Sequence, residues 1–380
     1  MADPSRPTFA QIDLDALRFN FRSARSFIGD DVKYMAVVKA DAYGHGAIEC
    51  SRVLIEAGVD WLGVALIDEA IELRNADLSI PILCLGGIAS GRETDAIERN
   101  ITPVIFNLDQ AEALNAAAAR SETDVNVHVK IDTGMGRLGV RWDQLGPLID
   151  GLSSFSNLRI QGLMTHLASA NDPEEIVFTN EQMDRFELAT RQFAAAGFEP
   201  EIVDLANSPA AVGHPRSRAQ MVRLGGIIYG LGGDVLDPSL PQPDLKPVMS
   251  LHSAIADIKT VPAGETLGYS RTFATTRDSL IALVPIGYYD GYRRNLSNRV
   301  DVLVNGKRAP VVGRISMDWT IVDVTDIPNT KNGDQVTLIG VDGGEQIRSE
   351  ELAAILQTIS YEITCGISGR VPRRFVKSAP

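Results

Sequence analysis

The sequence predicts an α/β protein: a (β/α)₈ barrel of the TIM type over residues 1–240, followed by a mainly β domain over residues 241–380. Short apolar runs alternate with helix-like segments between Val32 and Gly230, and such alternation is typical of a parallel sheet. The number of these units, about eight, fits a closed barrel. The pattern changes after 231–247, a segment rich in Gly, Pro and Asp that is typical of a linker.

The predicted barrel strands are continuous apolar runs, as expected for strands that are buried on both faces. They cover residues 32–39, 61–66, 80–86, 101–106, 124–132, 158–167, 198–207 and 221–230. Segments with apolar residues at helical spacing separate them, for example 46–58 and 107–120. An open, doubly wound sheet is the competing architecture. It is disfavoured because no glycine-rich dinucleotide-binding turn follows the first strand.

The second domain is predicted from alternating apolar and polar residues. Strands are expected at 251–261, 279–288, 299–306, 307–315, 319–325 and 335–340. Asn305-Gly306 and Asn332-Gly333 are turn signals between them. One helix is expected at 349–358.

Composition and charge limit the possible function classes. The formal charge is -13, from 36 basic and 49 acidic residues, and no long run of Lys or Arg is present. This argues against binding of nucleic acid or an anionic membrane, although a few donors are enough to bind a small anion. The three cysteines are far apart, and no two histidines lie at metal-ligand spacing with a carboxylate. We therefore expect no disulfide, no metal site and, since no signal or membrane segment is evident, a cytoplasmic protein.

The strongest local signal for chemistry is AVVKADAYGHG at 36–46. Its Lys39 ends a predicted barrel strand, and the carboxyl ends of barrel strands carry the active sites of this fold. An amine held among apolar walls loses its proton readily and can attack a carbonyl group. A lysine that merely extends its amine to solvent at a strand end is the alternative.

This motif resembles the cofactor-binding lysine motif of alanine racemases. Further segments resemble that family in the same order along the chain: 127–139, 164–170, 206–210, 221–230, 264–270, 285–292, 313–318, 358–363 and 370–373. The resemblance implies a barrel followed by a β domain, a pyridoxal 5'-phosphate cofactor, and interconversion of L- and D-alanine to supply peptidoglycan synthesis.

The resemblance also implies roles for individual residues. Lys39 would bind the cofactor covalently and act as one catalytic base, and Tyr269 would act as the second base on the opposite face of the substrate. A racemase needs a proton donor or acceptor on each face. Arg223 would donate a hydrogen bond to the pyridine nitrogen, and Met317 would contact the substrate through its backbone. Lys130 matches a position that is carbamylated in many relatives.

The remaining implied site residues surround the cofactor. Those that would bind it, besides Lys39 and Arg223, are Tyr43, Arg137, His166, Ser208, Gly225, Gly226 and Tyr361. Arg137 would also contact the substrate. Tyr288, Arg294 and Arg314 match positions at the entrance of the site. Asp132 is expected to have a turn or capping role.

The resemblance further implies a homodimer, because Tyr269 and Met317 would reach the barrel of the other subunit. Other functions stay open: a racemase for serine or a broader set of amino acids, an amino-acid decarboxylase, a non-catalytic cofactor carrier, or a barrel without cofactor. A decarboxylase is expected to place an acidic group at the pyridine nitrogen, where this chain offers Arg223.

Overall fold

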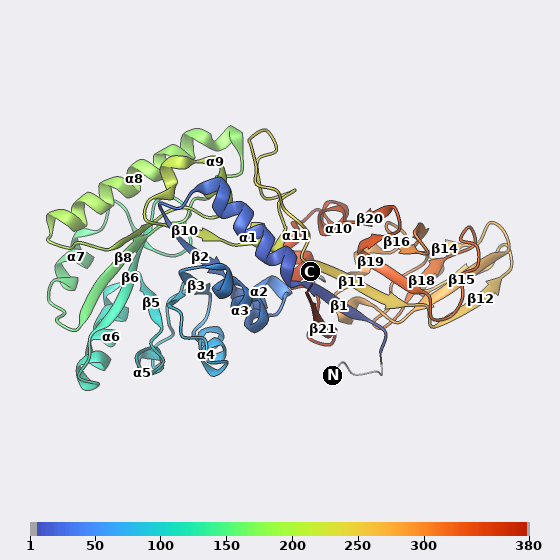
Figure 1. Ribbon diagram of the computed structural model, residues 1–380, viewed down its shortest axis with the longest axis horizontal. Helices are drawn as coiled ribbons and strands as arrows, with labels where there is room; N and C mark the ends of the chain where they lie inside the picture. Colours follow the sequence, from blue (N-terminus) through green and yellow to red (C-terminus); the bar gives the residue numbers. More distant parts are fainter. Residues whose placement is uncertain (1–5, 378–380) are drawn as a thin grey trace.

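A computed structural model describes residues 6–377 of the chain. It consists of a barrel surrounded by helices and an elongated β domain beside it (Figure 1). The barrel strands run in the order β5-β4-β3-β2-β10-β9-β8-β6, and pairing of β5 with β6 closes the barrel. The eight strands are β2 (Lys33–Val37), β3 (Trp61–Val64), β4 (Ile82–Cys84), β5 (Thr102–Ile105), β6 (Val125–Asp132), β8 (Leu158–Met164), β9 (Ile202–Asp204) and β10 (Met221–Leu224). All eight predicted barrel strands are therefore confirmed.

Apolar side chains fill the inside of the barrel. Met35, Trp61, Leu83, Met164 and other inward-facing residues form one buried cluster. A second, larger cluster lies between the strands and the surrounding helices and continues into the β domain. The helices that follow barrel strands are α2 (Lys39–Gly44), α3 (Ala47–Ala57), α4 (Ile67–Asn75), α5 (Glu93–Glu98), α6 (Leu108–Arg120), α7 (Gly146–Leu152), α8 (Ile176–Ala195) and α9 (Ser208–Gly213). The barrel is thus a packed core whose rim is free to carry a site.

In the ring of helices, the position after the last barrel strand is occupied by a helix from the N-terminal part of the chain. β10 is followed only by the short 3₁₀ segment η3 (Gly226–Tyr229), against which α1 (Leu14–Ile28) packs, between α3 and α9. The side chain of Asp13 caps α1 by accepting hydrogen bonds from the backbone N–H groups of Asp15 and Ala16, both at 2.9 Å.

β1 (Phe9–Asp13) corrects the predicted domain boundary, which assigned residues 1–240 to the barrel. β1 lies in the sheet of the β domain, antiparallel to β11 and parallel to β21. Its burial alternates residue by residue, as in a strand of a sheet with one buried face, so the chain begins in the second domain before α1 enters the barrel.

The β domain contains a seven-stranded sheet, a three-stranded sheet and a small hairpin. Its further strands are β11 (Met249–Ala254), β12 (Asp257–Val261), β13 (Thr266–Leu267), β14 (Phe273–Ala274), β15 (Ser279–Val284), β16 (Asp301–Val304), β17 (Lys307–Pro310), β18 (Thr320–Asp323), β19 (Gln335–Asp342), β20 (Glu345–Ile347) and β21 (Arg373–Val376). The predicted turn at Asn305-Gly306 is confirmed, since Val304 pairs with Lys307 across it.

Two helices of the β domain lie close to the barrel. α10 (Ser349–Leu356) confirms the predicted helix, whereas α11 (Ser360–Cys365) was not predicted and packs against α2. Through α11 the second domain contributes to the rim of the barrel of its own chain. Among the described residues, no helix combines the length and the apolar character needed to cross a bilayer.

Candidate active site

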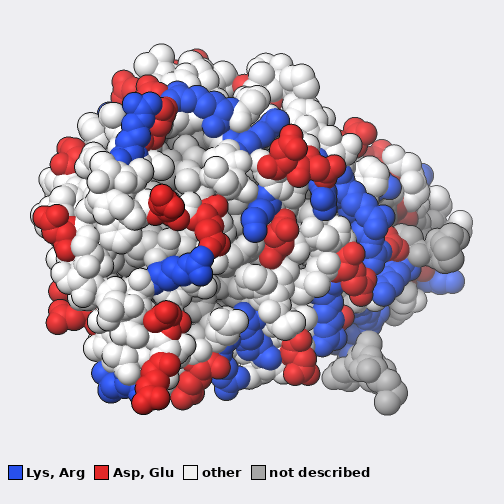
Figure 2. All heavy atoms as spheres, turned by 60° about the vertical axis from the view of Figure 1, so that its left-hand side comes forward, with Lys and Arg blue, Asp and Glu red and all other residues white. Residues whose placement is uncertain are grey.

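A cavity of about 460 Å³ lies at the carboxyl ends of the barrel strands. Nearly all the predicted cofactor residues line it, although they come from distant parts of the sequence. These are Lys39, Tyr43, Arg137, His166, Ser208, Arg223, Gly225 and Tyr361, together with Lys130. Acidic and basic side chains are interspersed on the face of the molecule turned forward in Figure 2.

Lys39 enters the cavity directly after β2, at the start of α2. Its pKa is lowered, mainly because burial disfavours the charged amine and also because Arg137 is close by. A lowered pKa makes the neutral, nucleophilic form of the amine more available. This position fits the predicted nucleophile.

One wall of the cavity is a cradle of hydrogen-bond donors. The backbone N–H of Gly225 donates to the Ser208 Oγ at 2.8 Å. A Cβ added to Gly225 would lie 2.7 Å from the Tyr43 hydroxyl, and one added to Gly226 would overlap the ring and hydroxyl of Tyr361. Burial raises the pKa of both tyrosines, which keeps their hydroxyls protonated as donors. Hydroxyls beside a bare glycine backbone suit a phosphate group.

Another part of the cavity centres on Arg223. Its guanidinium is ion-paired with Asp204 on the adjacent strand, and both side chains are buried. The Nη2 donates to the Thr165 carbonyl at 3.0 Å and lies 3.2 Å from the Nδ1 of His166. Burial, followed by the nearby positive charge of Arg223, lowers the pKa of His166 to about 2. His166 is therefore a neutral acceptor beside a permanent cation.

Lys130 is buried on β6 between this arginine and the Arg137 loop. Burial, with further repulsion from Arg223 and Arg137, lowers its pKa to about 7. In a large fraction of the molecules, the Lys130 amine is thus uncharged near neutral pH. In the same loop, the Asp132 Oδ1 accepts from the N–H groups of Gly134 and Gly136 at 2.9 and 3.1 Å, which confirms its turn role.

Tyr269 and Met317 do not line this cavity. They belong to the β domain, where 67% of Tyr269 and 49% of Met317 is exposed. The large side chains of Tyr288, Tyr289 and Trp319 are also exposed in this domain. Within one chain, the structure therefore does not bring the two predicted bases together.

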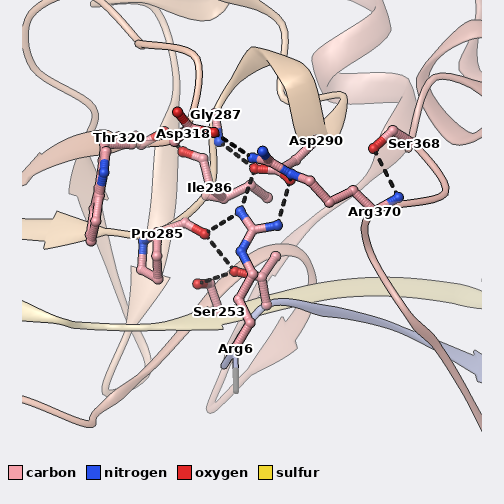
Figure 3. Close-up of polar contacts among 12 residues, drawn as sticks. Arg6, Ser253, Pro285, Ile286, Gly287, Asp290, Asp318, Thr320, Ser368 and Arg370 are labelled. Atoms are coloured by element: carbon pink, nitrogen blue, oxygen red, sulfur yellow. Dashed lines mark hydrogen bonds and ion pairs between the residues drawn. The ribbon is translucent and has the colours of Figure 1, made fainter. Parts of the chain in front are cut away.

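A buried carboxylate organises this exposed part of the β domain (Figure 3). Asp290 accepts hydrogen bonds from both Nη atoms of Arg6 at 2.6 Å and from the Nε of Arg370 at 2.7 Å. Arg370 also donates to Asp318 at 2.7 Å. Because Asp318 follows Met317 directly, this network fixes the loop that carries Met317.

Sequence reasoning missed two residues close to the site. Asp204 ends the apolar strand β9 and is buried. A charged residue in such a run indicates a buried partner of opposite charge, which is Arg223. Glu69 accepts a hydrogen bond from the backbone N–H of Ala40, next to Lys39, at 2.6 Å. No local pattern pointed to Glu69, since it lies 29 residues from Ala40.

Comparison with known proteins agrees with this arrangement. The family model described as alanine racemase, N-terminal domain, matches residues 12–232, and the one described as alanine racemase, C-terminal domain, matches residues 248–375. The chain belongs to the alanine racemase family. This confirms the resemblance stated above, and both domains of the family are present.

Individual members of the alanine racemase family match over nearly the whole length. The alanine racemase of Halothermothrix orenii is 42% identical over 98% of this chain and 97% of its own, and that of Geobacter sulfurreducens is 42% identical over 98% of each. The structure of alanine racemase from Bacillus anthracis with bound L-Ala-P is 36% identical, with a TM-score of 0.92 over 100% of this chain and 97% of the other. That from Bartonella henselae, with covalently bound pyridoxal phosphate, is 30% identical, with a TM-score of 0.86 over 98% and 100%. These relatives support the alanine racemase prediction and not the serine or broad-specificity alternative.

Proposed function

We propose that this protein is a pyridoxal-phosphate-dependent alanine racemase, which interconverts L- and D-alanine. The observation that carries the proposal is the pairing, in one cavity, of a buried amine of lowered pKa with a cradle of phosphate donors. A carbonyl-bearing phosphate ester fits both features at once. Family membership supports alanine as the substrate.

The cavity residues fit pyridoxal phosphate in chemical detail. Tyr43, Ser208, Tyr361 and the backbone at Gly225 and Gly226 would hold its phosphate. Arg223 would donate to its ring nitrogen, because a guanidinium donates hydrogen bonds and accepts none. Arg137 would contact the ring oxygen and the substrate. When bound, the cofactor supplies an electron-withdrawing ring that stabilises negative charge on the substrate α-carbon.

Arg223 limits how strongly the ring withdraws electrons. The guanidinium does not give up a proton, so the ring nitrogen of a bound cofactor would stay largely unprotonated. Asp204 keeps the guanidinium in place from behind. A weaker electron sink disfavours side reactions that need a long-lived carbanion, which suits a racemase better than a decarboxylase.

The proton transfers are assigned to Lys39 and Tyr269. Lys39 removes or returns the α-proton on one face of the substrate, and Tyr269 does so on the other. Because Tyr269 and Met317 are exposed and outside the cavity of their own chain, we place them in the cavity of a second copy. The active unit is then a homodimer with shared sites.

Lys130 is proposed to be carbamylated. The reaction needs a neutral amine, which the pKa of about 7 provides. The product is an anion between Arg137 and Arg223, where an ammonium group would be repelled. A role in supplying D-alanine for peptidoglycan and a cytoplasmic location remain expectations from the sequence.

The decisive experiment follows the optical activity of L-alanine incubated with the protein and pyridoxal phosphate. We expect decay to a racemic mixture by the wild type, no decay with Lys39→Ala, and normal decay with Lys33→Ala, which changes an exposed lysine at the start of β2, the strand that precedes Lys39. Racemisation of serine or lysine but not alanine would overturn the substrate. A cofactor-loaded protein that racemises no amino acid would overturn the reaction.

A further inference from the structure

The backbone that carries Lys39 and Tyr43 is unusual. Ala40, Asp41 and Ala42 all have φ 53° and ψ 49°, and Tyr43 has φ 56° and ψ 36°. These four residues form one turn of left-handed helix, although none of them is glycine. L-residues disfavour this conformation, because the Cβ approaches the following carbonyl oxygen. Surrounding contacts must therefore hold the turn in place.

Several contacts hold the far end of the turn. The Asp41 Oδ1 accepts from the N–H of Ala47 at 2.7 Å, and the Nε of Arg373 donates to the Gly44 carbonyl at 3.0 Å. The Nδ1 of His45 lies 2.9 Å from the Ala42 carbonyl. These contacts fix the direction in which the chain leaves the turn.

The near end of the turn, beside Lys39, is held by the side chain of Glu69 on α4. Its Oε1 accepts from the N–H of Ala40 at 2.6 Å. Its Oε2 accepts from the N–H groups of Ala65 and Leu66 at 2.7 and 3.0 Å, where α4 begins. One carboxylate thus joins the chain after β2 to the chain after β3, and these two strands are neighbours in the barrel.

We infer that Glu69 is a positioning residue for catalysis, which clamps the left-handed turn and so places the Lys39 amine and the Tyr43 hydroxyl in the cavity. This inference rests on the proposed role of Lys39. Glu69 does not line the cavity, so it acts through the backbone of Ala40 and not on substrate or cofactor.

The chemistry of the clamp requires a carboxylate. Three N–H donors converge on its two oxygens. A glutamine at this position has one accepting oxygen and an NH₂ group that would face a donor. Glu69→Gln therefore keeps the size of the side chain but loses either the Ala40 contact or the start of α4.

The test compares Glu69→Gln with Glu72→Gln on the same helix. Glu72 is exposed and makes no side-chain hydrogen bond within residues 6–377, so it controls for the loss of one negative charge. The apoproteins are mixed with pyridoxal phosphate, and covalent attachment is followed by absorbance on the alkaline plateau, where the Lys39 amine is neutral in each variant. Amide hydrogen exchange of a peptide covering 39–44 and the kcat and KM for alanine are measured in parallel.

For Glu69→Gln we expect the rate of covalent attachment and the kcat to fall at least about tenfold, with less change in KM, because the nucleophile is displaced. Exchange in 39–44 should accelerate, while Glu72→Gln matches the wild type in every measurement. Equal attachment and exchange in both variants would overturn the inference. If the wild type itself forms no covalent adduct, the proposed function has failed instead.

Discussion

The carboxylate of Asp204 and the guanidinium of Arg223 form a buried ion pair on the adjacent barrel strands β9 and β10. Asp204 is fully buried, and only 4% of the Arg223 side chain is exposed. Arg223 lines the cavity, and its Nη2 lies 3.2 Å from the Nδ1 of His166. The cation that faces the proposed cofactor ring is thus balanced within the protein core.

Replacing Asp204 with asparagine should destabilise the protein strongly. The change preserves shape but leaves the Arg223 charge buried without its partner, so we expect a loss of about 3–5 kcal/mol in the free energy of unfolding. Urea denaturation measures this. Asp184→Asn breaks an exposed pair with Arg216 and should cost less than about 1 kcal/mol. Equal losses of unfolding free energy in the two variants would contradict a buried ion pair between Asp204 and Arg223.

The glycine at position 226 should be required for cofactor binding. In Gly226→Ala the new methyl group would displace Tyr361, and we expect pyridoxal phosphate affinity to fall at least about tenfold, or about 1.4 kcal/mol. Equilibrium titration followed by absorbance provides the measurement. Gly344→Ala is a matched control, since nothing lies within 4 Å of its added Cβ. Undiminished affinity in Gly226→Ala would argue against the cradle.

Stability should fall in acid because of buried neutral histidines. Burial lowers the pKa of His45 to about 4 and that of His128 to about 3, from 6.5. Between pH 6.5 and the lowered pKa of each histidine, the unfolded chain binds a proton at that histidine that the folded chain does not. Each histidine therefore removes about 1.4 kcal/mol of stability per pH unit as the pH falls below about 6.5.

The histidine prediction is checked by the slope of the unfolding free energy against pH. Between pH 6 and pH 5, the slope for His128→Phe should be smaller than that of the wild type by about 1.4 kcal/mol per pH unit, which corresponds to about one proton. Comparing slopes removes any constant loss of stability that the phenylalanine causes. An unchanged slope would show that His128 titrates normally in the folded protein.

Shared sites predict complementation between two inactive variants. Lys39→Ala and Tyr269→Phe should each lose nearly all activity alone. If the protomers are mixed and reassembled, about one quarter of the sites combine an intact Lys39 with an intact Tyr269 from the partner. Recovery of activity on mixing is the measurement, and no recovery despite demonstrated subunit exchange would contradict a shared site.

Carbamylation of Lys130 predicts that the native mass of the chain exceeds that of the unmodified chain by one CO₂. Activity should also depend on bicarbonate after exhaustive removal of CO₂. Lys130→Met removes the amine, and its activity should be low and independent of bicarbonate. A native mass equal to that of the unmodified chain, with full activity, would exclude the modification.

The strands of the barrel and the longer strands of the β domain could be predicted because their signal is local. The single strand expected at 251–261 is instead two strands, β11 and β12, in different sheets. Continuous apolar runs report burial on both faces, and alternation reports burial on one. The motifs around Lys39, Arg137 and Arg223 likewise identified the residues that line the cavity. The sequence by itself therefore determined the fold class, the family and nearly all of the residues that we propose to bind the cofactor and that line the cavity.

Only the tertiary structure decided the placement of β1, α11 and Glu69. β1 pairs with strands more than 200 residues away, and α11 brings Tyr361 from the second domain to the barrel. The left-handed turn after Lys39 contains no glycine before Gly44, so no local preference reveals it. Such features depend on partners distant in sequence, and their energies are set by long-range contacts that no local pattern records.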